Sequence, residues 1–228
     1  MIRRGMILAA LALIASAQVR AHDVSTTPIT WNREISRIFF DRCASCHRPG
    51  GSSFSLMTYP EVQPRAVAIR DAVLSRRMPP WGAVKGFGDF RNDRALTAEQ
   101  IELITDWVQD DTPKGNNPRM LPPSPKFESA QAVTTPPDGV RVGGDTTLKA
   151  PVVVDGLLPE ADVDDARIVA IRPDGTVEPL VWLHGYSGAF GHPFLLRKPL
   201  TLEAGTVIRG VRPPARVLIM PAPSTGTH

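Results

Sequence analysis

The chain has 228 residues, of which 42% are hydrophobic, 26 are lysine or arginine and 23 are aspartate or glutamate. Three of the arginines lie in the first 21 residues, which contain no acidic residue, so the rest of the chain has equal numbers of basic and acidic side chains. This balance gives no case for binding nucleic acid, and the length is sufficient for two modest domains.

Residues 1–21 have the pattern of a cleavable secretory signal peptide. Two arginines precede the apolar run 6–15, which is too short to cross a bilayer. Small residues follow this run, so we expect cleavage after Ala17 or Ala21. The pattern predicts a periplasmic or otherwise exported protein with no stable membrane span in its mature chain.

Residues 30–42 carry apolar side chains at helical spacing, which predicts an amphipathic helix. This helix leads directly into residues 43–47, Cys-Ala-Ser-Cys-His, which is the attachment pattern of a c-type haem. Two thiols one turn apart can each form a thioether with a vinyl group of the porphyrin. We therefore predict that Cys43 and Cys46 bind the haem covalently and that the His47 imidazole ligates the iron.

Three other roles of this cysteine pair fit the sequence less well. A zinc site usually has four nitrogen or sulfur ligands with a second ligand cluster, and the chain has no other cysteine. A thioredoxin-like redox pair belongs beside a βαβ pattern, whereas the flanking sequence is helical. A short-range disulfide in an oxidising compartment is the third alternative.

Residues 48–57 lack periodicity and contain Pro49 and two glycines, so we expect a loop. A ligating histidine usually donates its second ring N–H to a nearby carbonyl, and the Pro49 carbonyl is the partner that we predict for His47. A capping box at residues 58–61 begins the next helix, which is expected to end near Arg77.

Met78 directly precedes Pro79 and Pro80, and a residue before proline is driven out of the α region. The helix should therefore stop near Met78, on an extended strap that the two prolines stiffen. This methionine, 31 residues after His47, is our predicted second axial ligand of the iron. Methionine opposite histidine is the ligation that raises the reduction potential in cytochromes c.

Residues 82–95 are rich in glycine, which predicts a loop. A second capping box, at residues 97–100, begins a further amphipathic helix. We expect Trp107 of this helix to pack against Phe39 or Ile35.

Residues 30–115 resemble the monohaem class I cytochrome c domain of an exported bacterial family. In that family the domain often precedes a β-rich region similar to part of the C-terminal domain of copper type II, ascorbate-dependent monooxygenases. The stretches that carry the resemblance are residues 32–35, 41–51, 69–81 and 96–101. The resemblance implies one covalent haem c on Cys43 and Cys46, with His47 and Met78 as the axial ligands.

Seven prolines lie between residues 112 and 139, which predicts a semi-rigid linker. Beyond it, short runs rich in valine, isoleucine and leucine predict β-strands, and a Pro-Asp-Gly at residues 173–175 predicts a hairpin turn. The predicted strands are residues 147–155, 166–172, 176–183, 193–197, 206–211 and 216–220. Short antiparallel strands of this kind indicate a small β-sandwich.

Two groups of residues in this second part have side chains that can bind metals. His184 and His192 flank a glycine-rich loop, but a copper site needs about three ligands, so we interpret them as hydrogen-bonding surface groups. Asp162, Asp164 and Asp165 lack further oxygen ligands at the spacing of a calcium loop, which favours a solvated acidic turn.

The sequence thus predicts a multidomain α + β protein. An N-terminal all-α cytochrome c fold is expected at residues 22–115, a proline-rich linker at residues 116–139 and a small antiparallel β-sandwich at residues 140–228. The boundaries follow the change in composition at the prolines.

The predicted function is that of an exported c-type cytochrome with one haem c, which passes electrons to a redox protein partner. We expect an electron carrier rather than an enzyme and no nucleic-acid partner, and the oligomeric state stays open. One alternative is a haem-containing part of a redox enzyme, either copper monooxygenase-like or a peroxidase. A peroxidase needs an open sixth position at the iron, which Met78 would close. Another alternative is a cytochrome that its β-rich part tethers to a larger complex.

Overall fold

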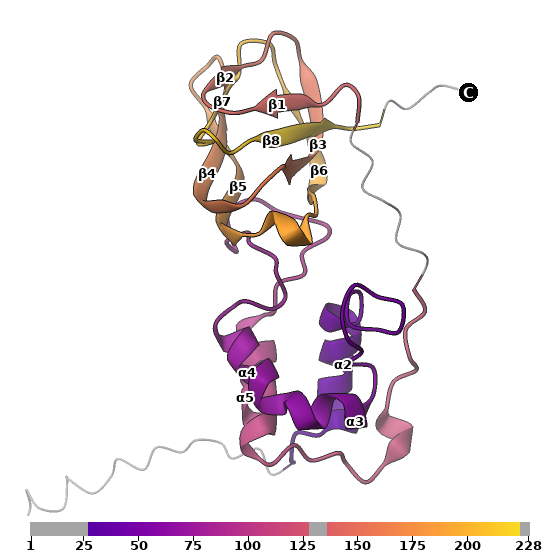
Figure 1. The fold of residues 1–228 in the computed structure, drawn as a ribbon. Coiled ribbons are helices and arrows are strands. Elements are labelled where there is room, and N and C mark those ends of the chain that lie inside the picture. The colour runs from indigo at the N-terminus through magenta and orange to yellow at the C-terminus, as the bar shows by residue number, and fades with distance from the viewer. Residues whose placement is uncertain (1–26, 128–135, 224–228) are drawn as a thin grey trace, which may run out of the picture.

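The computed structural model describes residues 27–127 and 136–223. The predicted signal peptide and the middle of the predicted linker lie outside these residues. Figure 1 shows two parts, a helical region from the first half of the chain and a β region formed by residues 140–221. Within the described residues, no helix is both long and apolar enough to cross a bilayer.

The helical region (residues 29–78 and 96–120) begins with a continuous helical run into the cysteine motif. The run starts as the π-helix η1 (Trp31–Ile35), continues as α2 (Ser36–Ile38) and ends as the π-helix η2 (Phe39–Cys43). The first cysteine of the motif is therefore the last residue of a helix.

The next helix is interrupted at a proline. Its capping box forms, since the Glu61 carboxylate accepts a hydrogen bond of 2.8 Å from the Thr58 N–H. Pro64 has no N–H to continue an α-helix, and the chain forms a 3-10 turn around it. The segments are α3 (Tyr59–Val62), η3 (Gln63–Arg65) and α4 (Ala66–Leu74). The helix ends three residues earlier than predicted, at Leu74.

Helix α5 (Ala98–Gln109) closes the helical region. The Gln100 N–H donates to Thr97 Oγ1 at 3.1 Å, and the Thr97 N–H donates to Gln100 Oε1 at 3.0 Å, so the predicted capping box forms. A short 3-10 turn, η4 (Pro118–Met120), follows.

Two tryptophans join α5 to the first helical run. The ring of Trp107 lies 6.4 Å from that of Trp31, and both donate to the Pro113 carbonyl at 3.0 Å, Trp107 through Nε1 and Trp31 through its backbone. We predicted Phe39 or Ile35 as the partner of Trp107. Both belong to the same buried cluster, but the aromatic pair is formed with Trp31.

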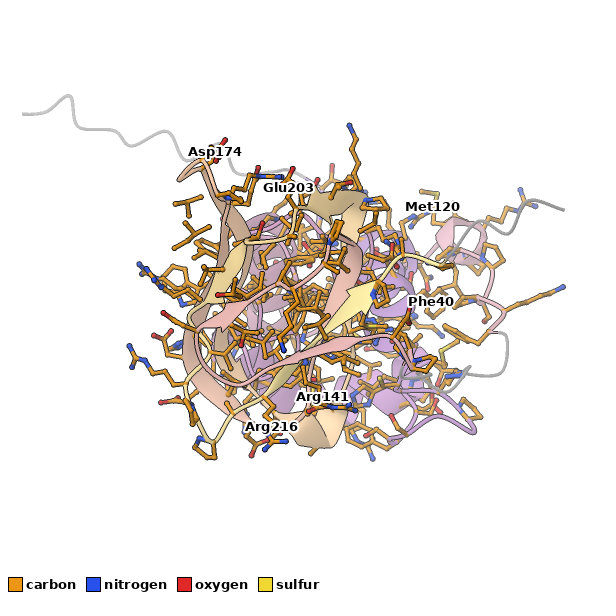
Figure 2. The ribbon with its side chains drawn as sticks, turned by 90° about the horizontal axis from the view of Figure 1, so that it is seen from above. Phe40, Met120, Arg141, Asp174, Glu203 and Arg216 are labelled. Carbon is orange, nitrogen blue, oxygen red and sulfur yellow. The ribbon has the colours of Figure 1, made fainter. Side chains whose placement is uncertain are left out.

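The β region consists of two four-stranded antiparallel sheets, with strand orders β1-β8-β3-β6 and β2-β7-β4-β5. Buried residues of both sheets belong to one core, and Figure 2 looks down on the β region and shows its side chains. The strands are β1 (Val140–Val142), β2 (Thr146–Thr147), β3 (Val152–Pro159), β4 (Val163–Ile171), β5 (Val177–Tyr186), β6 (Phe194–Leu202), β7 (Val207–Arg209) and β8 (Val217–Pro221). A short 3-10 turn, η5 (Gly188–Phe190), precedes β6.

Residues 79–95, here called the bridging segment, connect the two parts. The segment leaves the helical region after Met78, runs to the β region and returns to α5 (Figure 1). It forms one β-bridge with β5, between Ala83 and Leu183, and another with β6, between Phe90 and Leu196. Since β5 and β6 are edge strands of different sheets, the bridging segment covers one edge of each.

These observations correct the fold class that we predicted. The described structure is mostly β, built on two antiparallel sheets, its helices are short, and the N-terminal half does not form an all-α cytochrome c fold. The bridging segment is the physical reason for this difference, because its residues Trp81 and Phe90 are buried in the core of the β region and not in the helical region. The predicted strap and the predicted glycine-rich loop at residues 82–95 thus contribute residues to the β core. The predicted domain limits at residues 22–115, 116–139 and 140–228 stay a prediction.

Candidate haem-binding site

The cysteine motif forms a compact turn at the end of η2. The N–H groups of Cys46 and His47 both donate to the Cys43 carbonyl, at 3.1 and 2.9 Å. Ala44, between the two cysteines, is fully buried and fixes the turn against the protein. Both cysteines are free thiols, so the short-range disulfide is not formed here. The turn therefore presents two thiols and one imidazole within five residues.

The His47 ring has a defined orientation. Its Nδ1 lies 2.9 Å from the Phe54 carbonyl oxygen, and the two rings meet edge to face at 4.8 Å. A carbonyl only accepts, so Nδ1 is the donor, and in the neutral ring Nε2 then has the lone pair. Among the described residues Nε2 has no hydrogen-bond partner. The ring is thus prepared to ligate a metal through Nε2.

The partner of His47 corrects our prediction of the Pro49 carbonyl. The Leu56 N–H donates to the His47 carbonyl at 3.1 Å, which folds the loop back over the motif and brings the Phe54 carbonyl to the ring. No side-chain signal could have identified this partner, because the group is a backbone carbonyl whose position depends on the loop conformation.

The Cys43 thiol is packed against the helical core. Its pKa is raised to about 12, chiefly by burial and to a lesser extent by the charges of Asp41 and Cys46. The thiol therefore stays protonated at neutral pH. A neutral thiol is a weak nucleophile, which keeps this cysteine from reacting with other partners.

This raised pKa predicts a pH dependence for the haem-free protein. In the unfolded chain the thiol ionises above its ordinary pKa of 9.0, whereas in the folded protein it ionises near pH 12. The stability that it contributes is complete below pH 9 and is lost as the pH rises, by up to about 1.4 kcal/mol per pH unit. Urea unfolding of Cys43→Ala should lack this component. Equal losses in both proteins above pH 9 would contradict the burial of the thiol.

Gly51 allows the loop to pass close to the motif. A Cβ at this position would overlap the Cys46 carbonyl oxygen and would lie 3.0 Å from the Arg48 carbonyl oxygen. Both atoms belong to the backbone and cannot rotate away. Glycine is therefore required here by space alone.

We expect Gly51→Ala to distort the cysteine turn and to destabilise the haem-free protein by about 1–3 kcal/mol. The amount of haem attached during expression should fall as well. Gly143→Ala is the matched control, because its Cβ would meet Arg216 Cγ at an ordinary 3.5 Å. Thermal unfolding and the haem-to-protein absorbance ratio measure the two effects, and normal values for Gly51→Ala would contradict the steric argument.

Met78 lies between α4 and the bridging segment. Its N–H donates to the Ala72 carbonyl at 3.1 Å, and its side chain is half-buried. Met78 and His47 thus lie on separate segments, each with its own backbone contacts. Their pairing as two ligands of one iron stays a prediction.

The other candidate residues lie in the β region. His184 is exposed, as predicted, and lies 3.7 Å from an oxygen of Asp165, whereas His192 is buried, which corrects the surface position that we predicted for it. Asp162 accepts a hydrogen bond of 2.7 Å from the Gly188 N–H. Across the described ranges, no three histidine, cysteine, aspartate or glutamate side chains gather to hold a metal ion.

Comparison of the chain with models of protein families, with curated proteins and with solved structures finds no match. The resemblance of residues 30–115 to a cytochrome c family stays a prediction. The donor set itself fits a c-type haem: two free thiols, one protonated at neutral pH, and an imidazole whose Nε2 is available.

Proposed function

We propose that this protein is an exported c-type cytochrome that carries one haem c and transfers electrons to a redox protein partner. The observation that supports it best is the His47 ring, whose Nδ1–H donates to the Phe54 carbonyl while Nε2 stays available. This is the arrangement that a metal-ligating histidine requires. It occurs one residue after a pair of free thiols.

Each residue of the motif has its own task in this proposal. Cys43 and Cys46 would hold the porphyrin through two thioethers, and His47 and Met78 would bind the iron. Bound haem would supply an iron that exchanges single electrons, and binding by a methionine thioether as well as an imidazole would raise its reduction potential. The contacts of His47 with Phe54 would orient the ligating imidazole.

Expression of the full chain with the haem-attachment machinery tests the proposal. The purified protein should show an alkaline pyridine spectrum of a haem that acid acetone does not extract. Metal analysis should find one iron and no copper per chain. A protein isolated from the exported fraction without haem absorbance would overturn the proposal.

The enzyme alternative makes a different prediction for Met78. A peroxidase needs an open sixth position at the iron. If Met78 ligates the iron, the wild type should show little peroxidase turnover and Met78→Ala should show more. Turnover that is high in the wild type and unchanged in Met78→Ala would favour the enzyme.

A further inference from the structure

We propose that the β region positions Met78, and that Trp81 and His192 are the residues through which it does so. The inference rests on the proposed function for the role of Met78 as an iron ligand. The restraint itself concerns only protein residues. It assigns a task to the C-terminal half, which the sequence left without one.

Trp81 is the point at which the chain after Met78 enters the β core. Only 4% of the residue is exposed. Its ring stacks on His192, with 5.1 Å between centroids and 16° between planes, and meets Phe194 edge to face at 4.9 Å and Phe90 at 5.9 Å. A tryptophan in such surroundings moves only if the β core opens.

His192 lies against the backbone of Trp81 as well as its ring. The Nε2 atom lies 3.2 Å from the Trp81 carbonyl oxygen, and Nδ1 lies 2.9 Å from the Phe190 carbonyl oxygen. His192 is itself held by Tyr186, whose hydroxyl accepts from the His192 N–H at 3.2 Å and donates to its carbonyl at 3.3 Å. Burial lowers the pKa of His192, and the neutral imidazole donates to only one of these two carbonyls. Its stacking on the Trp81 ring therefore joins the bridging segment to the loop before β6.

The distance along the chain transmits this restraint to Met78. Trp81 is the third residue after Met78, so their Cα atoms cannot lie more than about 11 Å apart. Both intervening residues, Pro79 and Pro80, have a fixed φ. On the other side, the Met78 N–H is bound to the Ala72 carbonyl at 3.1 Å. Met78 is therefore restrained by the helical region before it and by the β region after it.

Hydrogen bonds with both edge strands keep the rest of the bridging segment in place. The Val84 N–H donates to the Trp182 carbonyl and the Arg197 N–H to the Asp89 carbonyl, both at 2.8 Å. The Arg91 N–H donates to the Leu195 carbonyl at 2.9 Å. Bonds with strands of both sheets oppose rotation of the segment as well as its detachment.

Two ion pairs add to these bonds. Arg91 binds both carboxylate oxygens of Asp155, at 3.0 and 2.7 Å, and Arg197 binds both oxygens of Asp89, at 2.9 and 3.0 Å. Single ion pairs at a surface contribute little. The Arg91 pair is bidentate, the Arg197 Nε–H is shared between the two Asp89 oxygens, and each arginine also donates to a backbone carbonyl across the same contact.

The first experiment uses the haem-free full chain and therefore does not depend on the proposed function. Hydrogen peroxide oxidises methionine to its sulfoxide, and mass spectrometry measures the rate at Met78, with Met57 as an internal reference. In His192→Ala we expect the rate at Met78 to rise several-fold and the rate at Met57 to stay unchanged. His184→Ala is the control, because the His184 side chain is exposed beside Asp165, and the bond of its backbone N–H to the Gly82 carbonyl survives the exchange. Equal rates at Met78 in wild type and His192→Ala would overturn the proposal.

A second pair of variants covers the case in which His192→Ala fails to fold. Arg91→Ala removes the ion pair with Asp155 from the bridging segment, whereas Arg209→Ala removes a pair with Asp145 that lies within the β region. Only Arg91→Ala should raise the oxidation rate at Met78. The same rate in both variants would overturn the proposal.

The second experiment uses the haem-loaded protein. Loosening the strap in His192→Ala should lower the reduction potential, since the potential depends on the thioether ligand, and His184→Ala should leave it unchanged. If Met78 becomes more reactive without haem and the potential stays constant, Met78 is not an iron ligand and the inference fails at that step. If the wild type binds no haem, the proposed function fails, and the oxidation rates still decide whether the β region restrains Met78.

Discussion

Replacing Cys43 and Cys46 together with serine is expected to abolish covalent haem attachment. A hydroxyl has nearly the size of a thiol but does not form a stable link with a porphyrin vinyl group. The turn should survive the exchange, because it is built from backbone hydrogen bonds to the Cys43 carbonyl and from buried Ala44. The haem-to-protein ratio after extraction with acid acetone should fall from about one to nearly zero.

Ser45→Ala is the matched control for this variant. Ser45 lies between the two cysteines, and its hydroxyl contacts Cys46 Sγ only at 3.9 Å. This variant should keep its haem. Haem that remains bound to the double serine variant after extraction would show that the attachment lies elsewhere in the chain, and the proposed function would have to be abandoned.

Replacing Trp81 with alanine is expected to have the largest effect on stability. The indole is buried among the rings of Phe90, His192 and Phe194, and its removal leaves a cavity that backbone hydrogen bonds on either side prevent from closing. Loss of a buried tryptophan costs about 3–5 kcal/mol. Urea unfolding of the haem-free full chain, followed by circular dichroism, measures this loss. Trp81→Phe keeps part of the ring contacts and should be intermediate.

Trp182→Ala is the control, since it removes a tryptophan side chain from the nearby strand β5. Trp182 is half-exposed, donates from Nε1 to Asp165 at 2.8 Å and lies under the Arg167 guanidinium at 3.8 Å. Contacts of this exposed kind contribute about 1 kcal/mol each. If Trp81→Ala costs no more than Trp182→Ala, the bridging segment is not part of the β core.

The features that could be predicted are those encoded within a few consecutive residues. The capping box at Thr97 and Gln100 forms as expected, because both partners lie in one helical turn. The hairpin turn at residues 173–175 connects β4 and β5, because its glycine has a positive φ of 86°. The Cys43 and Cys46 thiols lie one turn apart for the same local reason.

The features that were missed depend on residues far apart in the chain. The bridging segment contains aromatic residues among its glycines. This composition indicates that the aromatic side chains are buried, but it does not indicate which part of the protein buries them. The edge strands β5 and β6 determine the position of the bridging segment, since their unpaired backbone groups need hydrogen-bond partners. The prediction of an all-α N-terminal fold failed at this segment.

The sequence by itself determined the order of donors at the cysteine motif and the methionine strap after α4, since spacing and proline stereochemistry are local properties. Only the tertiary structure decided which carbonyl orients His47 and which half of the protein holds the chain after Met78. Phe54 and His192 take these roles because the loop and the β region bring them there, and neither residue is close to its partner within a shared helix or strand.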